Sequence, residues 1–158
     1  MYNDKVKIFS GSSNPHLAER ICEQLGQPLG SIKLSRFKSG EIYCLYQESV
    51  RNADVFLVQT FFSHPINEHF VELLVMIDAA KRASARSITL VVPYYGYSRQ
   101  ERKAAPREPI SAKMVADLLT YSGVQRLVTI DLHAPAIQGF FQHTGGSLDG
   151  SGPDFRLH

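Results

Sequence analysis

The sequence contains no tryptophan and only two cysteines, Cys22 and Cys44, in 158 residues. The cysteines form neither a CxxC pair nor a metal-ligand spacing, so we expect two reduced, buried thiols rather than a disulfide framework or a zinc site. The first residues, MYNDKVKIFSG, contain no apolar signal-peptide core. No apolar run approaches the length of a membrane span. These absences predict a cytoplasmic protein that does not contact a membrane.

A marked excess of charge of one sign is also absent. The chain has 17 Lys and Arg residues against 15 Asp and Glu residues, a formal net charge of +2. Such a small surplus does not by itself indicate a nucleic-acid partner. Hydrophobic residues make up 44% of the chain, which is ordinary for a globular protein. The length predicts one domain that can bury a core without disulfides.

Short apolar runs alternate with stretches of helical periodicity. Strands are expected at residues 6–9, 54–59, 87–93 and 127–130, and helices are expected to begin near Asn14, Pro65 and Pro109. Two further strands, 32–37 and 42–46, flank a connection of hairpin length. Apolar runs that can be buried on both faces, separated by helices, are typical of an α/β protein. The sequence therefore predicts a mostly parallel sheet flanked by helices, with an inserted β-hairpin.

The stretch after Pro65 predicts the longest helix, which is apolar on more than one face. Its core stripe and the residues that widen it are Phe70, Leu73, Leu74, Ile77, Val71, Val75 and Met76. A helix of this kind is mostly buried, so we expect it to pack on the sheet and against another subunit or domain. From His143 onward, Gly, Ser and Asp residues replace any apolar period, which predicts a tail rather than a domain.

The two commonest phosphate-binding motifs are absent. No GxxxxGK is followed by Ser or Thr, and no GxGxxG fingerprint follows a strand. Ligands of open α/β sheets bind beyond the carboxyl ends of the strands. Three polar clusters lie at such ends or can fold back to them, namely residues 37–41, 99–107 and 131–133.

The cluster at residues 99–107 is basic and directly follows a buried strand. Its cations are Arg99, Arg102, Lys103 and Arg107. The guanidinium group of Arg offers a planar fork that matches phosphate oxygens. Long loops in compact domains are usually functional, which favours an anion site here. The alternative is a solvated loop that is merely charged.

The other two clusters also allow two interpretations each. Asp131 and His133 alternate at a strand end, so their side chains share one side and can hold a divalent cation or orient a phosphate. A buried His bonded to its neighbour is the alternative. In the hairpin connection, Phe37 can stack on a base while Glu41 contacts the edge of that base. Simple packing of the Phe37 ring is the alternative there.

Six segments in order carry a family resemblance, from Lys7 to Phe141. They are KIFSGSSNPHLAERI, SRFKSGEIY, ESVRNADVFLVQ, NEHFVELLVMIDAAKRASA, VVPYYGYSRQERKAAPREPISAKMVADLL and TIDLHAPAIQGFF. They resemble the N-terminal half of the ribose-phosphate pyrophosphokinases, and YSRQERKAAPREPISAK and IDLHAPAIQGFF are highly specific to that family. The resemblance implies a phosphoribosyltransferase-like fold. It also implies an enzyme that transfers a diphosphoryl group from Mg-ATP to the C1 hydroxyl of ribose 5-phosphate, giving PRPP and AMP, with Mg²⁺ as cofactor.

The resemblance also implies roles for individual positions. Phe37, Ser39, Gly40 and Glu41 match an adenine-binding hairpin that in this family serves a neighbouring subunit, which implies a homo-oligomer. Arg99 and Gln100 match an ATP-binding pair. His133, with Asp131 beside it, matches the residue that meets the magnesium–triphosphate group.

A third group, Ser49, Arg51, Ser84 and Arg107, matches a regulatory site for inorganic phosphate or ADP. No catalytic residue is assigned in this half of the enzyme. The chain departs from the family pattern at two positions. Ser39 stands where the family usually has Asp or Asn, and Glu101 stands where it usually has Asp.

Two other function classes are alternatives. A non-catalytic, nucleotide-binding regulatory subunit of the same family would usually carry disturbed RQ and DLH segments, whereas both are intact here. A nucleic-acid-binding module would need a continuous basic face. Glu101 and Glu108 interrupt the basic segment, so the sequence predicts no nucleic-acid partner.

The end of the chain departs from the family. Residues 1–142 are expected to form the N-terminal ATP-binding domain, and residues 143–158 a Gly- and Ser-rich tail of non-native character. The family continues after GFF with a segment like DIPVDHLTAxGPI and a second domain. Codons permitted for residues 143–158, shifted by one base, can spell IPVDHLTAVGPIFAY, which predicts a lost reading frame after Gln142. We expect such a chain to make no PRPP, because the half that holds the sugar phosphate is absent and positioning dominates this chemistry.

Overall fold

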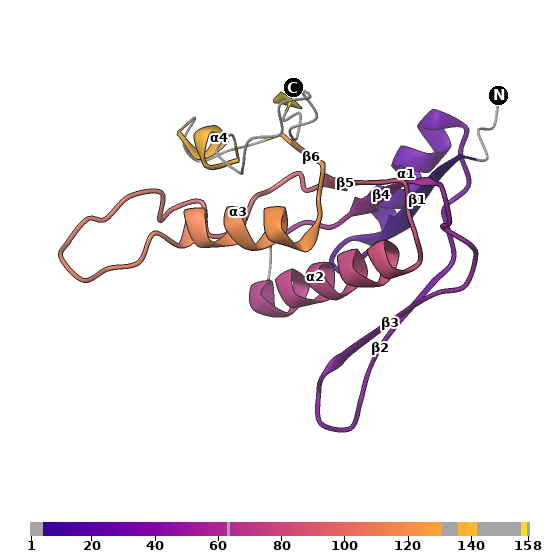
Figure 1. Cartoon of the computed structure of the whole chain (residues 1–158), viewed down its shortest axis with the longest axis horizontal. Helices are drawn as coiled ribbons and strands as arrows, with labels where there is room; N and C mark the ends of the chain where they lie inside the picture. Colours follow the sequence, from indigo (N-terminus) through magenta and orange to yellow (C-terminus); the bar gives the residue numbers. More distant parts are fainter. Residues whose placement is uncertain (1–4, 63, 131–135, 142–155, 158) are drawn as a thin grey trace.

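The computed structural model describes residues 5–62, 64–130, 136–141 and 156–157, and it contains one parallel sheet and one separate hairpin. The strands are β1 (Val6–Ser10), β2 (Ile32–Arg36), β3 (Ile42–Tyr46), β4 (Asp54–Val58), β5 (Ser87–Val91), β6 (Arg126–Thr129) and β7 (Arg156–Leu157). The helices are α1 (Pro15–Leu25), α2 (Ile66–Arg82), α3 (Ser111–Ser122) and the short α4 (Ile137–Phe140). Figure 1 shows their arrangement.

The main sheet has the strand order β1-β4-β5-β6-β7, and every neighbouring pair in it is parallel. Helix α1 packs on one face, where Ala18 and Cys22 join Ile8 and Val58 in a small apolar cluster. Helices α2 and α3 cover the other face and supply most of the larger core. The predicted α/β class, with a parallel sheet between helices and an inserted hairpin, is confirmed.

Local signals in the sequence set the ends of the helices. The side chain of Asn14 accepts a hydrogen bond from the Leu17 amide at 3.1 Å, and Pro15 is the first residue of α1. Gly26 and Gly123 end α1 and α3 with φ values of 62° and 108°, a left-handed conformation that other residues adopt only at a cost. Helix α3 begins at Ser111, slightly later than Pro109 predicts.

The hairpin of β2 and β3 lies outside the main sheet and runs along α2 (Figure 1). Tyr46, at its base, packs edge-to-face on Phe9 of β1 with ring centroids 4.7 Å apart. The Tyr46 hydroxyl donates to the Met76 carbonyl of α2 at 2.8 Å. These two contacts fasten the hairpin to both the sheet and the helix.

Helix α2 is buried more extensively than a helix that contacts only a sheet. Leu73, Met76 and Ile77 are fully buried, while β3 packs along another side of the helix. The chain's own hairpin therefore supplies part of the second packing surface that the sequence predicts for this helix. Val71 stays 47% exposed. No helix in the described part of the chain has the length and apolarity needed to cross a membrane.

The segment predicted as a tail contributes two residues to the described structure. Arg156 and Leu157 pair with Val128 and Thr129, so that β7 extends the parallel sheet. The sequence pattern did not predict this strand. Residues 142–155 and 158 lie outside the described residues.

Candidate functional site

The carboxyl edge of the sheet carries the first candidate segment, a long loop of residues 92–110 between β5 and α3. Its base is firmly packed. Tyr95 is fully buried and its hydroxyl donates to the Ala112 carbonyl at 3.2 Å. A Cβ atom at Gly96 would lie 2.7 Å from Cβ of Phe61, so only glycine fits there without a shift of the backbone. The loop therefore leaves the sheet in a fixed direction.

Gln100 connects the base of the long loop to the start of α3. Its side-chain oxygen accepts a hydrogen bond from the Ser111 hydroxyl at 2.6 Å, and its backbone carbonyl accepts one from the Ala112 amide at 3.2 Å. The late start of α3 follows from these bonds, because Gln100 supplies partners for the first turn. The amide nitrogen of the Gln100 side chain has no hydrogen-bond partner among the described residues, and it can donate to a ligand.

The cations of the long loop are exposed. Arg99 makes no ion pair with any described residue, and Arg102 lies 3.8 Å from Glu101. Glu108 accepts hydrogen bonds from the amides of Ala104 and Ala105, both at 2.9 Å. Glu108 therefore shapes the tip of the loop, in addition to interrupting its positive charge. Arg99 is the basic residue nearest to the fixed base, which favours it as an anion ligand.

The second candidate segment is the hairpin tip, residues 37–41. The amide of Phe37 donates to the Glu41 carbonyl and the amide of Gly40 to the Phe37 carbonyl, both at 2.9 Å. Gly40 has a φ of 93°, which closes the turn. The Ser39 hydroxyl donates to the Glu41 carboxylate. The Phe37 ring touches Tyr43 edge-on and is 56% exposed, so it is accessible for stacking with a ligand.

These two segments project from the body in different directions. In Figure 1 the hairpin tip lies at the lower end of the picture and the long loop extends to the left. The structure therefore does not bring the tip residues that are predicted to bind adenine next to Arg99 and Gln100. Each segment touches the first turn of α2 instead.

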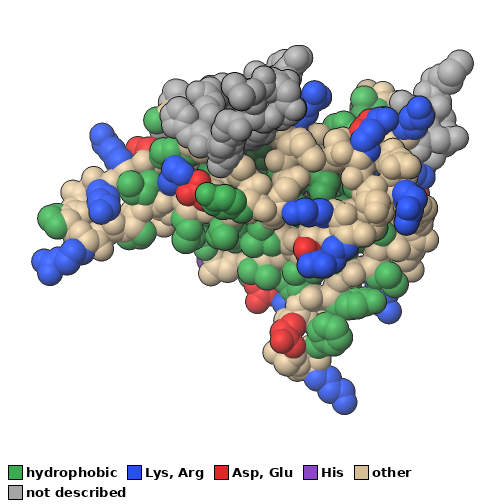
Figure 2. Space-filling model, in the orientation of Figure 1, with side chains coloured by type: hydrophobic (Ala, Val, Ile, Leu, Met, Phe, Trp, Pro, Cys, Tyr) green, Lys and Arg blue, Asp and Glu red, His purple; other side chains and the backbone are tan. Residues whose placement is uncertain are grey.

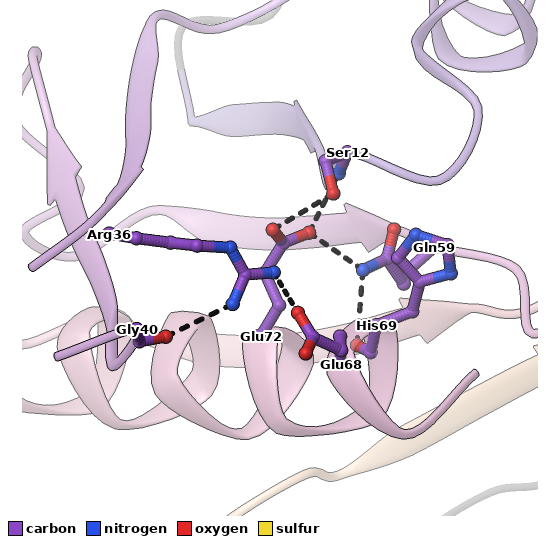
Figure 3. A network of polar contacts seen from close by, with 7 residues as sticks. All are labelled: Ser12, Arg36, Gly40, Gln59, Glu68, His69 and Glu72. Carbon is purple, nitrogen blue, oxygen red and sulfur yellow. Dashed lines mark hydrogen bonds and ion pairs between the residues drawn. The ribbon is translucent and has the colours of Figure 1, made fainter. Parts of the chain in front are cut away.

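The first turn of α2 contacts both segments. Figure 3 shows its contact with the hairpin. Glu68 forms an ion pair with Arg36 at the end of β2, and the same guanidinium group donates to the Gly40 carbonyl at 3.1 Å. Asn67 accepts a hydrogen bond from the Tyr97 hydroxyl of the long loop. An open pocket of about 440 Å³ lies at this point. It is lined by His64, Pro65, Ile66, Asn67, Glu68 and Tyr97.

One turn further along α2, the buried carboxylate of Glu72 lies in a network that sequence patterns missed. It accepts hydrogen bonds from the Ser12 amide at 2.7 Å, the Ser12 hydroxyl at 2.9 Å and the Gln59 side chain at 2.8 Å (Figure 3). Gln59 in turn accepts bonds from the amide and hydroxyl of Ser13 at 3.1 Å and 2.6 Å. The network joins the segments after β1 and β4 to α2. The only sequence signal for this network is the position of Glu72, a glutamate within an apolar helical stripe.

The residues of the predicted regulatory site are divided between two edges of the sheet. The Arg51 amide donates to the Ser49 hydroxyl at 3.4 Å, and the Asn52 amide donates to the Ser84 carbonyl at 2.9 Å. These residues precede β4 and β5, at the amino edge. Arg107 lies in the long loop, beyond the carboxyl end of β5. The structure thus groups three of the four predicted residues and separates the fourth.

The predicted metal ligands Asp131 and His133 lie outside the described residues. Within the ranges that the structure does describe, no group of three or more His, Cys, Asp or Glu side chains is placed to hold a metal ion.

Comparisons with known proteins identify relatives of this arrangement. Residues 6–123 match the family model described as the N-terminal domain of ribose phosphate pyrophosphokinase. A ribose-phosphate pyrophosphokinase from Fusobacterium nucleatum is 56% identical over 138 residues, covering 87% of this chain and 43% of the relative. One from Bacillus subtilis is 52% identical over 141 residues, covering 89% and 44%.

A crystal structure of phosphoribosylpyrophosphate synthetase from Mycobacterium smegmatis superposes with a TM-score of 0.84 at 43% identity. The match covers 87% of this chain and 46% of that chain. The chain thus spans less than half the length of the relatives it matches.

Proposed function

Because the chain belongs to the family of N-terminal domains of ribose phosphate pyrophosphokinases, we propose that it is the ATP-binding half of an enzyme that makes PRPP. The enzyme would transfer the diphosphoryl group of Mg-ATP to the C1 hydroxyl of ribose 5-phosphate, releasing AMP. Residues 1–142 would form this half. The class of reaction rests on relatives that are named ribose-phosphate pyrophosphokinase and that extend well beyond this chain.

The observation that carries the proposal for this chain is the position of Arg99. Its guanidinium group is exposed and has no carboxylate partner in the described part of the chain. Arg99 directly follows residues 95–98, which are packed at the base of the long loop. An unpaired cation on a fixed support at the carboxyl edge of a parallel sheet suits a phosphate ligand. Gln100 beside it offers an amide donor, and its own position is fixed by Ser111.

The reaction needs positioning and charge neutralisation more than covalent help from the protein. The C1 hydroxyl oxygen would attack the β-phosphorus, and the bond from that phosphorus to the oxygen shared with the α-phosphate would break. Arg99 would neutralise phosphate charge as the bond breaks. Mg²⁺ brought with ATP would supply further neutralisation, and Asp131 and His133 are the residues proposed to meet it. We assign no general base to this half.

Self-association is part of the proposal. Exposed hydrophobic side chains gather over α2 and α3 in Figure 2. The exposed large hydrophobic residues of these two helices are Val71, Met114, Leu118 and Tyr121. A patch of this kind usually marks an interface. A second copy would also be needed to bring Arg107 to the amino-edge residues Ser49, Arg51 and Ser84, where phosphate or ADP would bind as effectors. Light scattering at tens of micromolar tests this, and a monomer alone would contradict it.

Titration calorimetry with Mg-ATP tests the nucleotide site directly. The chain is expected to bind ATP, and Arg99→Ala is expected to weaken binding about 10- to 1,000-fold, the loss typical of one phosphate clamp. Arg20→Ala is the matched control, because Arg20 is an exposed cation on α1, and binding should be unchanged. Equal affinity in wild type and Arg99→Ala would refute the assignment.

A second assay tests whether these 158 residues alone catalyse the transfer. Purified protein incubated with ribose 5-phosphate and Mg-ATP should form no PRPP and no AMP, because the residues that hold the sugar phosphate lie outside the matched half. PRPP formation at a rate near that of a full-length relative would overturn this proposal. It would leave the ATP-binding assignment intact.

A further inference from the structure

We propose that Asn67 and Glu68, consecutive residues in the first turn of α2, are positioning residues that fix the long loop and the hairpin tip relative to each other. Neither residue belongs to any site that the sequence predicts. The proposal rests on the proposed function, since it concerns the two segments assigned to ATP. It also makes predictions about the protein without nucleotide.

Asn67 controls the long loop through Tyr97. The Tyr97 hydroxyl donates to the Asn67 side-chain oxygen, and Tyr97 has a φ of 64°. A non-glycine residue in that conformation is held there by its surroundings. The Tyr97 carbonyl also accepts the Gln100 amide at 3.2 Å. Movement of Tyr97 would therefore move the turn that contains Arg99 and Gln100.

Glu68 controls the hairpin tip through Arg36. The guanidinium group of Arg36 bridges Glu68 and the Gly40 carbonyl, so one side chain joins α2 to the turn of the hairpin (Figure 3). Arg36 directly precedes Phe37, the ring proposed to stack on adenine. Both side chains of the ion pair are 45% exposed, so the pair contributes little to global stability. The ion pair instead sets the orientation of the hairpin tip.

The helix provides a rigid reference for both contacts. Consecutive residues on a helix point about 100° apart, so Asn67 and Glu68 can reach two different segments from one turn. One turn further on, Glu72 is buried and bonded to Ser12 and Gln59, which fixes this end of α2 to the sheet. Asn67, Glu68 and Tyr97 also line the open pocket at this point. Both ATP-binding segments thus take their orientation from one turn of α2.

ATP affinity of the full 158-residue chain is the first measurement. Glu68→Gln is expected to weaken Mg-ATP binding about 2- to 5-fold, and Asn67→Ala about 3- to 10-fold. Glu68→Asp, which keeps the carboxylate, should retain most of the affinity. Asp78→Asn is the matched control, because Asp78 forms an exposed ion pair with Arg82 on the same helix, away from both segments. Its affinity should equal wild type.

Double variants separate a specific contact from general damage. If Asn67 acts through Tyr97, then Asn67→Ala combined with Tyr97→Phe should weaken binding no more than either change alone. Likewise, the Mg-ATP affinity of Glu68→Gln combined with Arg36→Gln should equal that of the single variant that binds more weakly. Additive losses in both pairs would overturn the proposal, since the residues would then act independently.

Hydrogen exchange of the unliganded chain provides a readout that does not depend on ATP. Glu68→Gln should speed exchange of the Phe37 and Gly40 amides, and Asn67→Ala should speed exchange of the Gln100 amide, with strand amides of β4 and β5 unchanged. Unchanged exchange at all three tip and loop amides would overturn the positioning role, as would uniform acceleration across the sheet. If wild type binds no ATP but the local exchange responds as stated, the proposed function fails and the positioning role stands.

Discussion

The hairpin and the long loop both project from the body, but they are held in different ways. The hairpin has its own backbone ladder, with five residue pairs from Ile32–Tyr46 to Arg36–Ile42. The long loop has no paired strands of its own, and contacts with distant parts of the chain fix its base. These include backbone bonds from the Val92 amide to the Val128 carbonyl and from the Phe61 amide to the Tyr94 carbonyl, and the side-chain bond of Tyr95 to Ala112. A projecting segment can therefore be ordered by its own hydrogen bonds or by contacts with residues elsewhere in the chain. Only the first kind is visible in a short stretch of sequence.

The attachments of the two segments to the body also differ. Tyr46 fastens the hairpin from outside the sheet, through the Met76 carbonyl and the edge of Phe9. Tyr95 lies inside the core and fastens the loop through the Ala112 carbonyl. A change at the hairpin can therefore open one segment locally, whereas a change at the loop base disturbs the core. Three experiments test this difference.

The largest expected effect concerns the thiol of Cys44 in β3. Burial, together with the charge of Glu72, raises the pKa of Cys44 from 9.0 to about 11. At pH 8 the native chain should hold about 100-fold less Cys44 thiolate than the unfolded chain, and alkylation by iodoacetamide should slow in proportion. Peptide mass spectrometry at several pH values measures the rate. Unfolding in urea provides the reference.

The sign of the pH effect on stability follows from the same shift. Because the folded pKa of Cys44 is raised, the uncharged thiol favours the folded state. That contribution is complete below the pKa of the unfolded thiol and declines as the pH rises towards about 11. A native Cys44 that reacts at the unfolded rate at pH 8 would mean that the hairpin swings away from α2. The contrast between the two attachments would then be lost.

Much of the fold could be predicted from short-range signals. The strands appeared as apolar runs, α1 from Asn14-Pro15, and the helix ends from Gly26 and Gly123. Hairpin pairing followed from the length of the connection between β2 and β3. By contrast, β7 could not be predicted from the sequence. Its two residues follow a Gly-rich stretch, and they form a strand only because they pair with β6.

The second experiment compares Gly96 at the loop base with Gly40 at the hairpin tip. Gly96→Ala should destabilise the whole protein by about 2–3 kcal/mol, because the new methyl group meets the buried Phe61 side chain at 2.7 Å. Gly40→Ala has open space around it but a φ of 93°. Its cost should be about 1 kcal/mol and confined to the hairpin. Urea unfolding measures the first and exchange of the hairpin amides the second.

Gly139→Ala is the control for this pair, since a Cβ at Gly139 in α4 would meet no atom of the described residues within 4 Å. It should leave unfolding unchanged or slightly raise stability. If Gly96→Ala lowered the free energy of unfolding no more than Gly40→Ala does, the steric explanation for Gly96 would be wrong. Lack of space beside Phe61 would then not be what requires glycine at the loop base.

The candidate site was less predictable than the fold. Sequence alone identified Arg99, Gln100 and Phe37 as candidates, because their motifs are local. It did not reveal that Gln100 also bonds to the first turn of α3. It also gave no role to Asn67 or Glu68, whose partners lie 30 or more residues away. Contacts of that range depend on tertiary packing, which no local pattern encodes.

The smallest expected effects come from removing one hydroxyl group from each attachment, by Tyr95→Phe and Tyr46→Phe. Tyr95 is fully buried in the core, so loss of its bond to Ala112 should lower the free energy of unfolding by about 1 kcal/mol. Loss of the Tyr46 bond should lower it by less, about 0.5 kcal/mol or below, because the hairpin can loosen alone. Faster exchange of the β2 and β3 amides should reveal that loosening, with the main sheet unaffected.

Alkaline pH gives these two variants a second comparison. Burial raises the pKa of both Tyr46 and Tyr95, with smaller contributions from the charges of Cys44 and Asp117 respectively. Each phenol therefore stabilises the folded state fully below the unfolded tyrosine pKa of about 10, and that contribution declines at higher pH. Tyr95→Phe should reduce the loss of global stability between pH 9 and pH 11, whereas Tyr46→Phe should mainly reduce the loss of hairpin protection. Equal effects on global stability would show that hairpin and loop base unfold as one unit, and the distinction between a locally and a globally attached segment would be wrong.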